Sequence, residues 1–384
     1  MPVPYPLDLD QLPPLPGPGQ RQYWGGLQGA APALALARAA LAHPGLTLLI
    51  TESSRQADRL YAELEFFLAD SGETLELLAF PDWETLPYDN FSPHQDIISA
   101  RLATLHRLPH VRHGVLILSV TTLLHRLPPR HYIDANTLSL SVGQRFVIDD
   151  MRRTLEAAGY QAVDSVYEHG EYAVRGAIMD LFPMGSATPY RIELFDDEID
   201  SLRIFAPDTQ LSTDKVQEVR LLPGREYPLH PEAIAGFRQA FRAAFDVDVR
   251  RCPLYDDISK GLASAGIEYY LPLFFPDLVS LFSYLPATPQ CLTFGEIGQG
   301  AEQFWREIRS RFEERSIDRE RPILPPERLF LSLDELYGAL KPLPQLQLHS
   351  RQMEPRAGTY NLPPAEFPDL AVDAKAERPM ARLE

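Results

Sequence analysis

Residues 33–51, ALALARAALAHPGLTLLIT, decide the fold class of this chain. The first part, residues 33–41, is rich in alanine and leucine, which favour a helix. Residues 46–51 form a short, continuously apolar run, typical of a strand buried on both faces of a parallel sheet. A helix followed by such a strand predicts an α/β domain, in which helices cover the faces of a parallel sheet.

The pattern continues on the carboxy-terminal side of this stretch. Residues 56–69 repeat apolar positions at helical spacing, and residues 75–80 and 115–120 are two more short apolar runs. Alternating helices and buried strands imply parallel pairing with helical crossovers. We therefore expect residues 25–125 to form the first part of a parallel-sheet domain.

Residues 126–222 have a different character. Residues 137–142, 170–183 and 190–205 alternate with a period of two, and one amphipathic helix is expected at residues 149–158. Alternation of this kind is typical of an antiparallel sheet with one face in water. This stretch is predicted to be a small α+β domain.

Residues 223–350 return to helical periodicity. Helices are expected at residues 231–245 and 301–315, and strands at residues 291–294 and 329–331. The stretch is therefore predicted to be mainly helical, with short strands.

The two ends of the chain are expected to lack regular structure. The chain has 384 residues and 36 prolines. Prolines cluster in residues 1–24, which we interpret as a proline-rich arm. Residues 351–384 lack periodicity and read as a linker toward a missing domain.

Composition limits the possible functions. The formal net charge is −17, which argues against nucleic acid as the main partner, because phosphate binding needs a basic face. No apolar run approaches the roughly 18 to 20 residues that span a membrane, so we expect no membrane partner and a cytoplasmic location. Cys252 and Cys291 are too few and too far apart for a metal site or a disulfide framework.

A phosphate loop is the first motif to be sought in such a fold. It reads G-x-x-x-x-G-K-[ST], where the amides hold phosphates, the lysine neutralises them and the hydroxyl binds magnesium. The corresponding positions ahead of residues 33–41 are Trp24, Gly29, Ala30 and Ala31. Because three of the four required residues are wrong, ATP hydrolysis has no chemical basis here. The stretch is either a glycine-rich helix entry or a degenerate phosphate loop, and we favour the second.

No other catalytic or metal site is indicated. Residues 80–101, FPDWETLPYDNFSPHQDIISAR, contain Asp82, Glu84 and His94, which could suggest acid–base chemistry. We favour a packed loop anchored by its aromatic residues. Glu296 follows the strand expected at 291–294 without the aspartate that a helicase magnesium site requires.

The most informative motif lies in residues 171–183, EYAVRGAIMDLFP, and 191–205, RIELFDDEIDSLRIF. Residues two apart in a strand share a face, so Arg191, Glu193 and Phe195 are expected on one face. Arg175 shares its face with small alanines, which leaves its guanidinium reachable. If the two segments pair as a hairpin, Arg175 and Arg191 are expected to lie nearly opposite.

Four strings carry a resemblance to a known family. They are residues 80–105 (FPDWETLPYDNFSPHQDIISARLATL), 168–186 (EHGEYAVRGAIMDLFPMGS), 191–205 (RIELFDDEIDSLRIF) and 266–275 (GIEYYLPLFF). From about residue 20 onward the chain closely resembles the amino-terminal region of bacterial transcription-repair coupling factors (Mfd). It resembles UvrB more loosely, and residues 172–183 and 191–199 look like the UvrB hairpin that contacts UvrA.

The resemblance implies an architecture and a binding site. It implies a degenerate helicase-like (RecA-like) α/β domain split into residues 25–125 and 223–350. A small UvrA-binding domain, residues 126–222, is inserted between the two parts. The positions matching the UvrA contacts are Arg175, Arg191 and Phe195, with Glu193 a weaker candidate.

The resemblance also implies the partners. UvrA is expected to bind the inserted domain, whereas RNA polymerase and double-stranded DNA bind parts of the full-length protein outside this chain. A carboxy-terminal domain is expected to mask the UvrA-facing surface. ATP and magnesium belong to the missing motor domains, so no cofactor or catalytic residue is expected here. The alternative is a UvrB-like ATP-dependent helicase or damage-recognition subunit.

Overall fold

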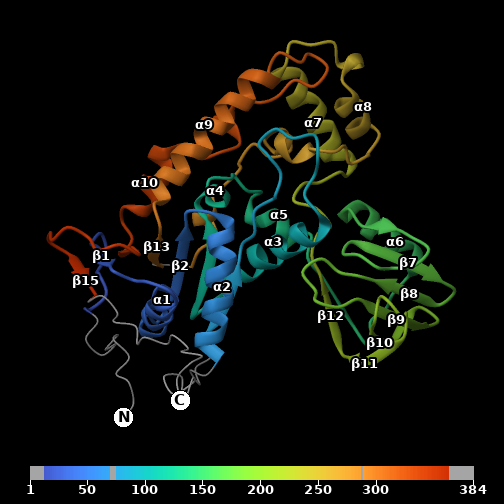
Figure 1. Ribbon diagram of the computed structural model, residues 1–384. Coiled ribbons are helices and arrows are strands. Elements are labelled where there is room, and N and C mark those ends of the chain that lie inside the picture. The colour runs from blue at the N-terminus through green and yellow to red at the C-terminus, as the bar shows by residue number, and fades with distance from the viewer. Residues whose placement is uncertain (1–12, 70–74, 287–288, 363–384) are drawn as a thin grey trace, which may run out of the picture.

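The computed structural model describes residues 13–69, 75–286 and 289–362 and contains a seven-stranded sheet (Figure 1). Every strand pair in this sheet is parallel. In spatial order its strands are β15 (Thr359–Asn361), β1 (Arg21–Gly25), β14 (Gln345–Leu348), β13 (Gln290–Phe294), β2 (Leu46–Thr51), β4 (Gly114–Ser119) and β3 (Glu76–Ala79).

Both faces of this sheet are covered, as its continuously apolar strands predict. On β2, Leu49 joins a core beneath α1 (Ala31–Ala42) and α2 (Ser54–Ala69). Leu48 and Ile50 point to the opposite face and join a larger core that includes α3 (Gln95–Arg107) and α9 (Ile297–Arg315). The alternation along one strand therefore divides the interior into two cores.

Shorter helices complete this part of the molecule. The remaining α-helices outside residues 138–221 are α4 (Val120–Leu123), α5 (Arg130–Ala135), α7 (Pro231–Ala244), α8 (Pro253–Ser259) and α10 (Leu333–Leu340), of which α7 and α8 lie away from the parallel sheet (Figure 1). The 3₁₀ turns are Leu108–His110, Val249–Arg251, Ile267–Leu273, Leu281–Ser283 and Pro326–Arg328. No helix within the described ranges combines the length and apolar character that crossing a membrane requires.

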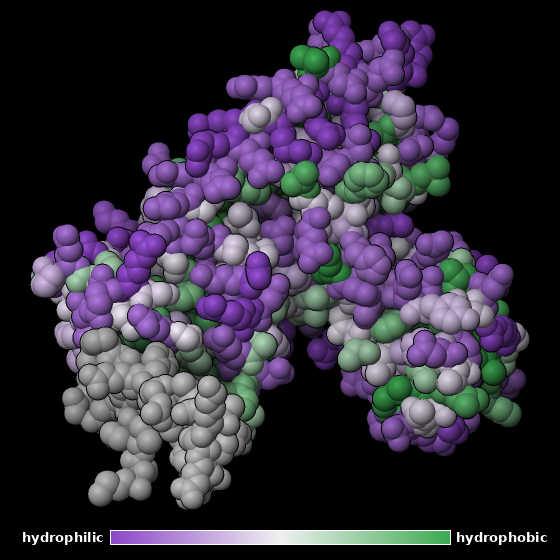
Figure 2. Space-filling model, in the orientation of Figure 1, coloured by the Kyte–Doolittle hydropathy of each residue, from purple (hydrophilic) through white to green (hydrophobic). Residues whose placement is uncertain are grey.

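A six-stranded sheet forms a separate lobe, seen on the right in Figures 1 and 2. It is antiparallel except for the pair β6–β7. Its strands, in spatial order, are β11 (Ser212–Val216), β10 (Glu198–Phe205), β9 (Tyr190–Phe195), β8 (Ile178–Leu181), β7 (Glu171–Arg175) and β6 (Gln161–Ala162). Helix α6 (Ile148–Ala158) and the ribbon of β5 (Leu138–Ser141) with β12 (Glu218–Leu221) complete it.

The structure corrects three expectations about secondary structure. Residues 329–331 form no strand, and Phe330 makes only an isolated bridge to His125. Residues 21–24, placed in the proline-rich arm, belong to β1, because their amides and carbonyls pair with neighbouring strands on both sides. Residues 359–361, placed in the linker, form β15. Residues 1–12 of the arm and 363–384 of the linker lie outside the described residues.

Most of the aromatic residues in the loop of residues 80–94 are buried and anchor it. Trp83 and Tyr88 are buried at 3% and 2% exposure, whereas Phe91 is 70% exposed and anchors nothing. Helix α3 begins after His94, whose ring nitrogen accepts a hydrogen bond from the Asp96 amide. His94 therefore serves as a helix cap rather than as an acid or base.

A buried ion pair holds the segment that follows β12 against α3. Arg101 donates to Glu226 at 2.7 Å, and the two side chains are 0% and 1% exposed. Glu226 also accepts from the Trp83 indole at 3.1 Å, and Arg101 lies 4.3 Å from the Phe80 ring centroid. Removing one partner from such a pair costs several kcal/mol, about 3 to 5, so this contact stabilises the place where the chain leaves the lobe.

Candidate protein-binding face

The strand order overturns the expected pairing of Arg175 and Arg191. Residues 171–181 form a hairpin by themselves, closed by a two-residue turn in which Gly176 has a φ of +63°. Glycine tolerates that conformation, and tight hairpins require it. Strand β8 therefore lies between β7 and β9, and Arg175 pairs with Ile178 while Arg191 pairs with Asp180.

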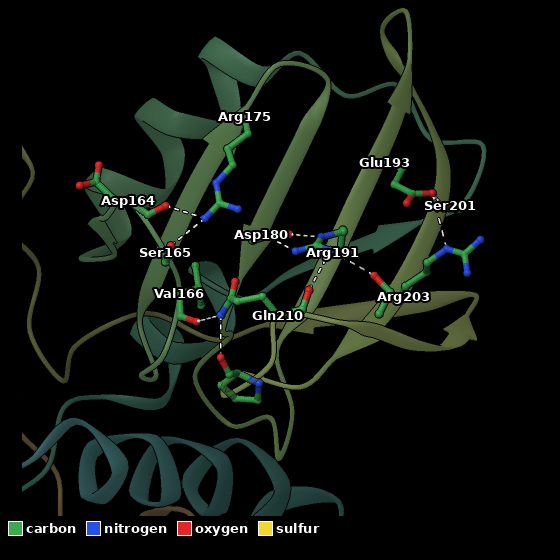
Figure 3. A network of polar contacts seen from close by, with 12 residues as sticks. Asp164, Ser165, Val166, Arg175, Asp180, Arg191, Glu193, Ser201, Arg203 and Gln210 are labelled. Carbon is green, nitrogen blue, oxygen red and sulfur yellow. Dashed lines mark hydrogen bonds and ion pairs between the residues drawn. The ribbon is translucent and has the colours of Figure 1, made fainter.

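The outer face of the six-stranded sheet consists of rows of paired residues (Figure 3). Paired residues in neighbouring strands share a face. One row runs from β8 to β11 and contains Asp180, Arg191, Arg203 and Lys215. The next row contains Arg175, Ile178, Glu193 and Ser201. The opposite, inner face carries Ile192 and Leu202, both fully buried.

Arg175 lies at the end of β7 with an exposed side chain, as predicted. Its Nη2 donates to the Asp164 carbonyl at 2.7 Å and to the Ser165 hydroxyl at 2.8 Å. Both acceptors are neutral, so the positive charge of Arg175 is not compensated by a carboxylate in these contacts. Arg175 is therefore available to an acidic partner.

Arg191, which the resemblance marks as a UvrA contact, has its guanidinium bonded within the lobe. Its Nε and Nη2 donate to the two carboxylate oxygens of Asp180 at 2.7 and 2.9 Å. Its Nη1 lies 3.2 Å from the Gln210 carbonyl and 3.3 Å from the Ser212 hydroxyl. The hydrogen bonds that Arg191 donates to the Asp180 carboxylate raise the pKa of Arg191 above its usual value. Since the Asp180 side chain is only 2% exposed, Arg191 primarily neutralises a buried carboxylate.

Glu193 is held within the sheet. Its carboxylate accepts a hydrogen bond from the Ser201 hydroxyl, and Oε2 lies 3.5 Å from Arg203 Nε. Arg203 and Glu193 side chains are 32% and 35% exposed. Glu193 therefore offers at most part of its carboxylate to another molecule.

Phe195 is the most exposed large hydrophobic residue of this lobe, at 73%. It pairs with Glu198 across a two-residue turn in which Asp196 has a φ of +52°. The turn leaves the ring at the tip of the β9–β10 hairpin. An exposed aromatic ring beside arginine is the composition of protein interfaces.

The sequence reasoning missed Asp180 and Arg203. A lone carboxylate inside the apolar run IMDLF, residues 178–182, is a signal for a buried ion pair, because an unpaired charge is too costly to bury. Continuing the period of two along residues 199–205 would have placed Arg203 on the face of Arg191. The signal for both was present, but their partners depended on the strand order.

The candidate phosphate loop connects β1 to α1. Trp24 is buried at 2% exposure, and Ala30 caps α1 without any side-chain hydrogen bond. The amides of Gly26 and Leu27 donate to the carbonyls of Arg351 and His349 at 2.9 and 3.1 Å. Two amides of the loop are thus already bonded to the chain itself.

Gly29 is the part of the loop that keeps the phosphate-loop identity. Its φ is +59°, and a Cβ added there would meet no atom within 4 Å. The position is therefore open, but no lysine or hydroxyl side chain adjoins it, because Ala30 and Ala31 follow.

Asp82, one of the carboxylates considered in the sequence, lies near two threonine hydroxyls and the buried His125. Asp82 accepts hydrogen bonds from the hydroxyls of Thr122 and Thr121 at 2.9 and 3.3 Å. His125 is buried, and its desolvation lowers its pKa to about 4. Among the described residues, no group of three or more His, Cys, Asp or Glu side chains is placed to hold a metal ion. Cys252 and Cys291 are buried free thiols.

Comparison with known proteins agrees with this geometry. The family described as the UvrB interaction domain matches residues 138–227, which include the whole outer face. The transcription-repair-coupling factor of Escherichia coli (strain K12) is 44% identical over 366 residues, covering 95% of this chain and 31% of that protein.

Two further relatives carry the same name. The protein of Haemophilus influenzae is 41% identical over 368 residues, covering 95% of this chain and 32% of the relative. The protein of Myxococcus xanthus is 34% identical over 334 residues, covering 83% and 28%. The chain therefore spans about a third of the length of these relatives. Near-complete coverage of the chain identifies it as an amino-terminal region belonging to the transcription-repair-coupling factor family.

Proposed function

We propose that this chain is a recruitment module that binds UvrA and thereby brings nucleotide-excision repair to RNA polymerase stalled at DNA damage. The observation that carries the proposal is that the matched UvrB interaction domain exposes both the Phe195 ring and Arg175, whose hydrogen bonds go to neutral acceptors. Acidic groups of UvrA would form charge-assisted hydrogen bonds with the arginines. A sheet face presents these groups in fixed positions, which lowers the entropic cost of docking.

The affinity for UvrA of a Phe195→Ala variant tests this proposal. Truncating a central interface aromatic typically costs roughly 2 kcal/mol or more, so we expect binding to weaken at least about tenfold. Phe66→Ala is the matched control, because Phe66 is 72% exposed on α2, outside the lobe. Unchanged affinity of the Phe195 variant, with an intact circular dichroism spectrum, would reject the face as the UvrA site.

We further propose that the parallel-sheet part is one helicase-like domain, residues 25–125 and 223–350, into which residues 126–222 are inserted. The membership of the strands in the sheets supports this division. Strands β1 to β4 and β13 to β15 belong to one sheet, whereas residues 138–221, which lie between them in the sequence, build two other sheets. The family match at residues 138–227 overlaps most of the proposed inserted domain and ends five residues beyond it.

The helicase-like part is proposed to have lost nucleotide binding. Residues Trp24, Ala30 and Ala31 remove the side chains that hold phosphate and magnesium. The bonds of the Gly26 and Leu27 amides to residues 349–351 occupy donors that a phosphate would otherwise use. Neither ATP hydrolysis nor saturable binding of a fluorescent ATP analogue is expected, and either one would revive the UvrB-like helicase alternative.

In the longer protein, the motor activity and further partners belong outside this chain. Its relatives are named coupling factors, so we propose an ATP-dependent DNA translocase that also contacts RNA polymerase and double-stranded DNA. We also propose that a carboxy-terminal domain masks the outer face in the resting protein. This chain should then bind UvrA more tightly than the full-length protein, and equal affinities would contradict masking.

A further inference from the structure

A row of like charges crosses the outer face of the six-stranded sheet. Arg203 on β10 lies directly between Arg191 on β9 and Lys215 on β11. Like charges in directly opposite positions destabilise a strand pair. Asp180 compensates Arg191 through two hydrogen bonds, but no carboxylate occupies an equivalent position beside Arg203 and Lys215 in that row.

Arg203 has unused binding capacity. Its side chain forms no hydrogen bond with the described residues, and its buried Nε lacks a hydrogen-bond partner. Its one ion pair is the 3.5 Å approach to Glu193, whose carboxylate also accepts from Ser201. A guanidinium has five donors in a fork that matches a carboxylate. Figure 3 shows the Arg203 guanidinium at the outer edge of the network, on the side away from Arg175.

Arg191 and Arg203 therefore differ in how readily each can bind another molecule. The three guanidinium nitrogens of Arg191 donate hydrogen bonds to Asp180, Gln210 and Ser212. Its side chain is only 16% exposed. Arg203 is 32% exposed, and the exposed Lys215 lies beside it. Arg203 and Lys215 together carry two positive charges, and the ion pair they form with the described residues is the 3.5 Å approach of Arg203 to Glu193.

We propose that Arg203, with Lys215 beside it, binds a carboxylate on an acidic surface of the partner, whereas Arg191 is a positioning residue that holds the sheet face together. This inference rests on the proposed function, because it takes UvrA as the molecule that docks on this face. It extends the binding surface from Arg175 and Phe195 across to β10 and β11. The incoming carboxylate relieves the repulsion along the row.

Titration of purified UvrA with single variants of the full 384-residue chain tests the proposal. Arg203→Ala is expected to weaken binding at least about tenfold, and Arg203→Lys, which keeps the charge but loses the fork, to weaken it less. Lys215→Ala should weaken binding by a few fold, because it removes only a point charge. Arg250→Ala is the control, since it removes one positive charge from an 86% exposed side chain outside the lobe.

The outcomes separate this inference from the proposed function. One outcome is that Arg203→Ala binds as tightly as Arg250→Ala while Phe195→Ala binds weakly. That result overturns the role of Arg203 and leaves the UvrA site in place. If Phe195→Ala and Arg175→Ala also bind UvrA normally, the outer face is not the UvrA site. Hydrogen exchange of β9 and β10 checks that each variant keeps its fold. Loss of binding with native exchange rates supports a direct contact.

Discussion

The Asp180–Arg191 pair predicts that Arg191→Ala destabilises the lobe itself, in addition to any effect on binding. The substitution leaves the Asp180 carboxylate, 2% exposed, without the two hydrogen bonds that now satisfy it. Breaking a buried pair by removing one partner costs about 3 to 5 kcal/mol. Because Arg191 retains 16% exposure, we expect the lower end of that range, about 3 kcal/mol.

Urea denaturation followed by circular dichroism measures the total change, and hydrogen exchange shows whether β8 and β9 open first. Arg175→Ala is the matched control, because it removes an arginine from the same face whose hydrogen bonds are exposed. A surface change of that kind typically costs no more than about 0.5 kcal/mol. The double variant Asp180→Ala/Arg191→Ala should be more stable than the sum of the single effects predicts.

An Arg191→Ala variant within about 0.5 kcal/mol of the wild type, with unchanged exchange in β8 and β9, would refute this reasoning. Arg191 would then be free to act as a direct contact. The expected result has a practical consequence for binding studies. Weak UvrA binding by Arg191→Ala would report partly on a disturbed sheet, so Arg175 and Phe195 are the better probes of contact.

Two further substitutions test the packing of the parallel-sheet part. Burial raises the pKa of Glu268 to about 7 from 4.5, so stability falls as pH rises between those values. Glu268→Gln should therefore be about 3 kcal/mol more stable than the wild type near pH 8 and equal to it near pH 4; a pH-independent difference contradicts this. Gly26→Ala should lower the melting temperature more than Gly29→Ala. Both glycines have positive φ, but only at Gly26 would the Cβ lie within 3 Å of residues 352 and 362; equal shifts contradict this.

Local pattern was sufficient for most elements of the parallel sheet. The apolar run at residues 46–51 is β2, with the same bounds, and the alanine-rich stretch before it is α1. Such runs are recognisable because a strand buried on both faces has no polar position to alternate with. Strand β1 was hidden by its polar residues and by the prolines before it. It is stabilised by β14 and β15, more than 300 positions away, and such pairing leaves no local signal.

The sequence indicated which residues share a face of the lobe, but it did not indicate the order of the strands. The period of two placed Arg191 and Ile192 on opposite faces, and the structure agrees. The same pattern could not show that Gly176 turns the chain, so β8 and its Asp180 were not expected beside Arg191. The exposure of Arg191 depends on this neighbouring strand. Whether an arginine in an alternating strand is free or paired depends on which strand lies next to it.

Two buried features of the parallel-sheet part support the proposal that it carries a binding lobe. The amides of Gly26 and Leu27 are bonded to residues 349–351, and β1 pairs with β14 and β15. The segment that follows β12 is held against α3 by the buried pair of Arg101 and Glu226. We expect these contacts to keep Arg175, Phe195 and Arg203 in a constant orientation. The partner then does not have to order the surface it binds.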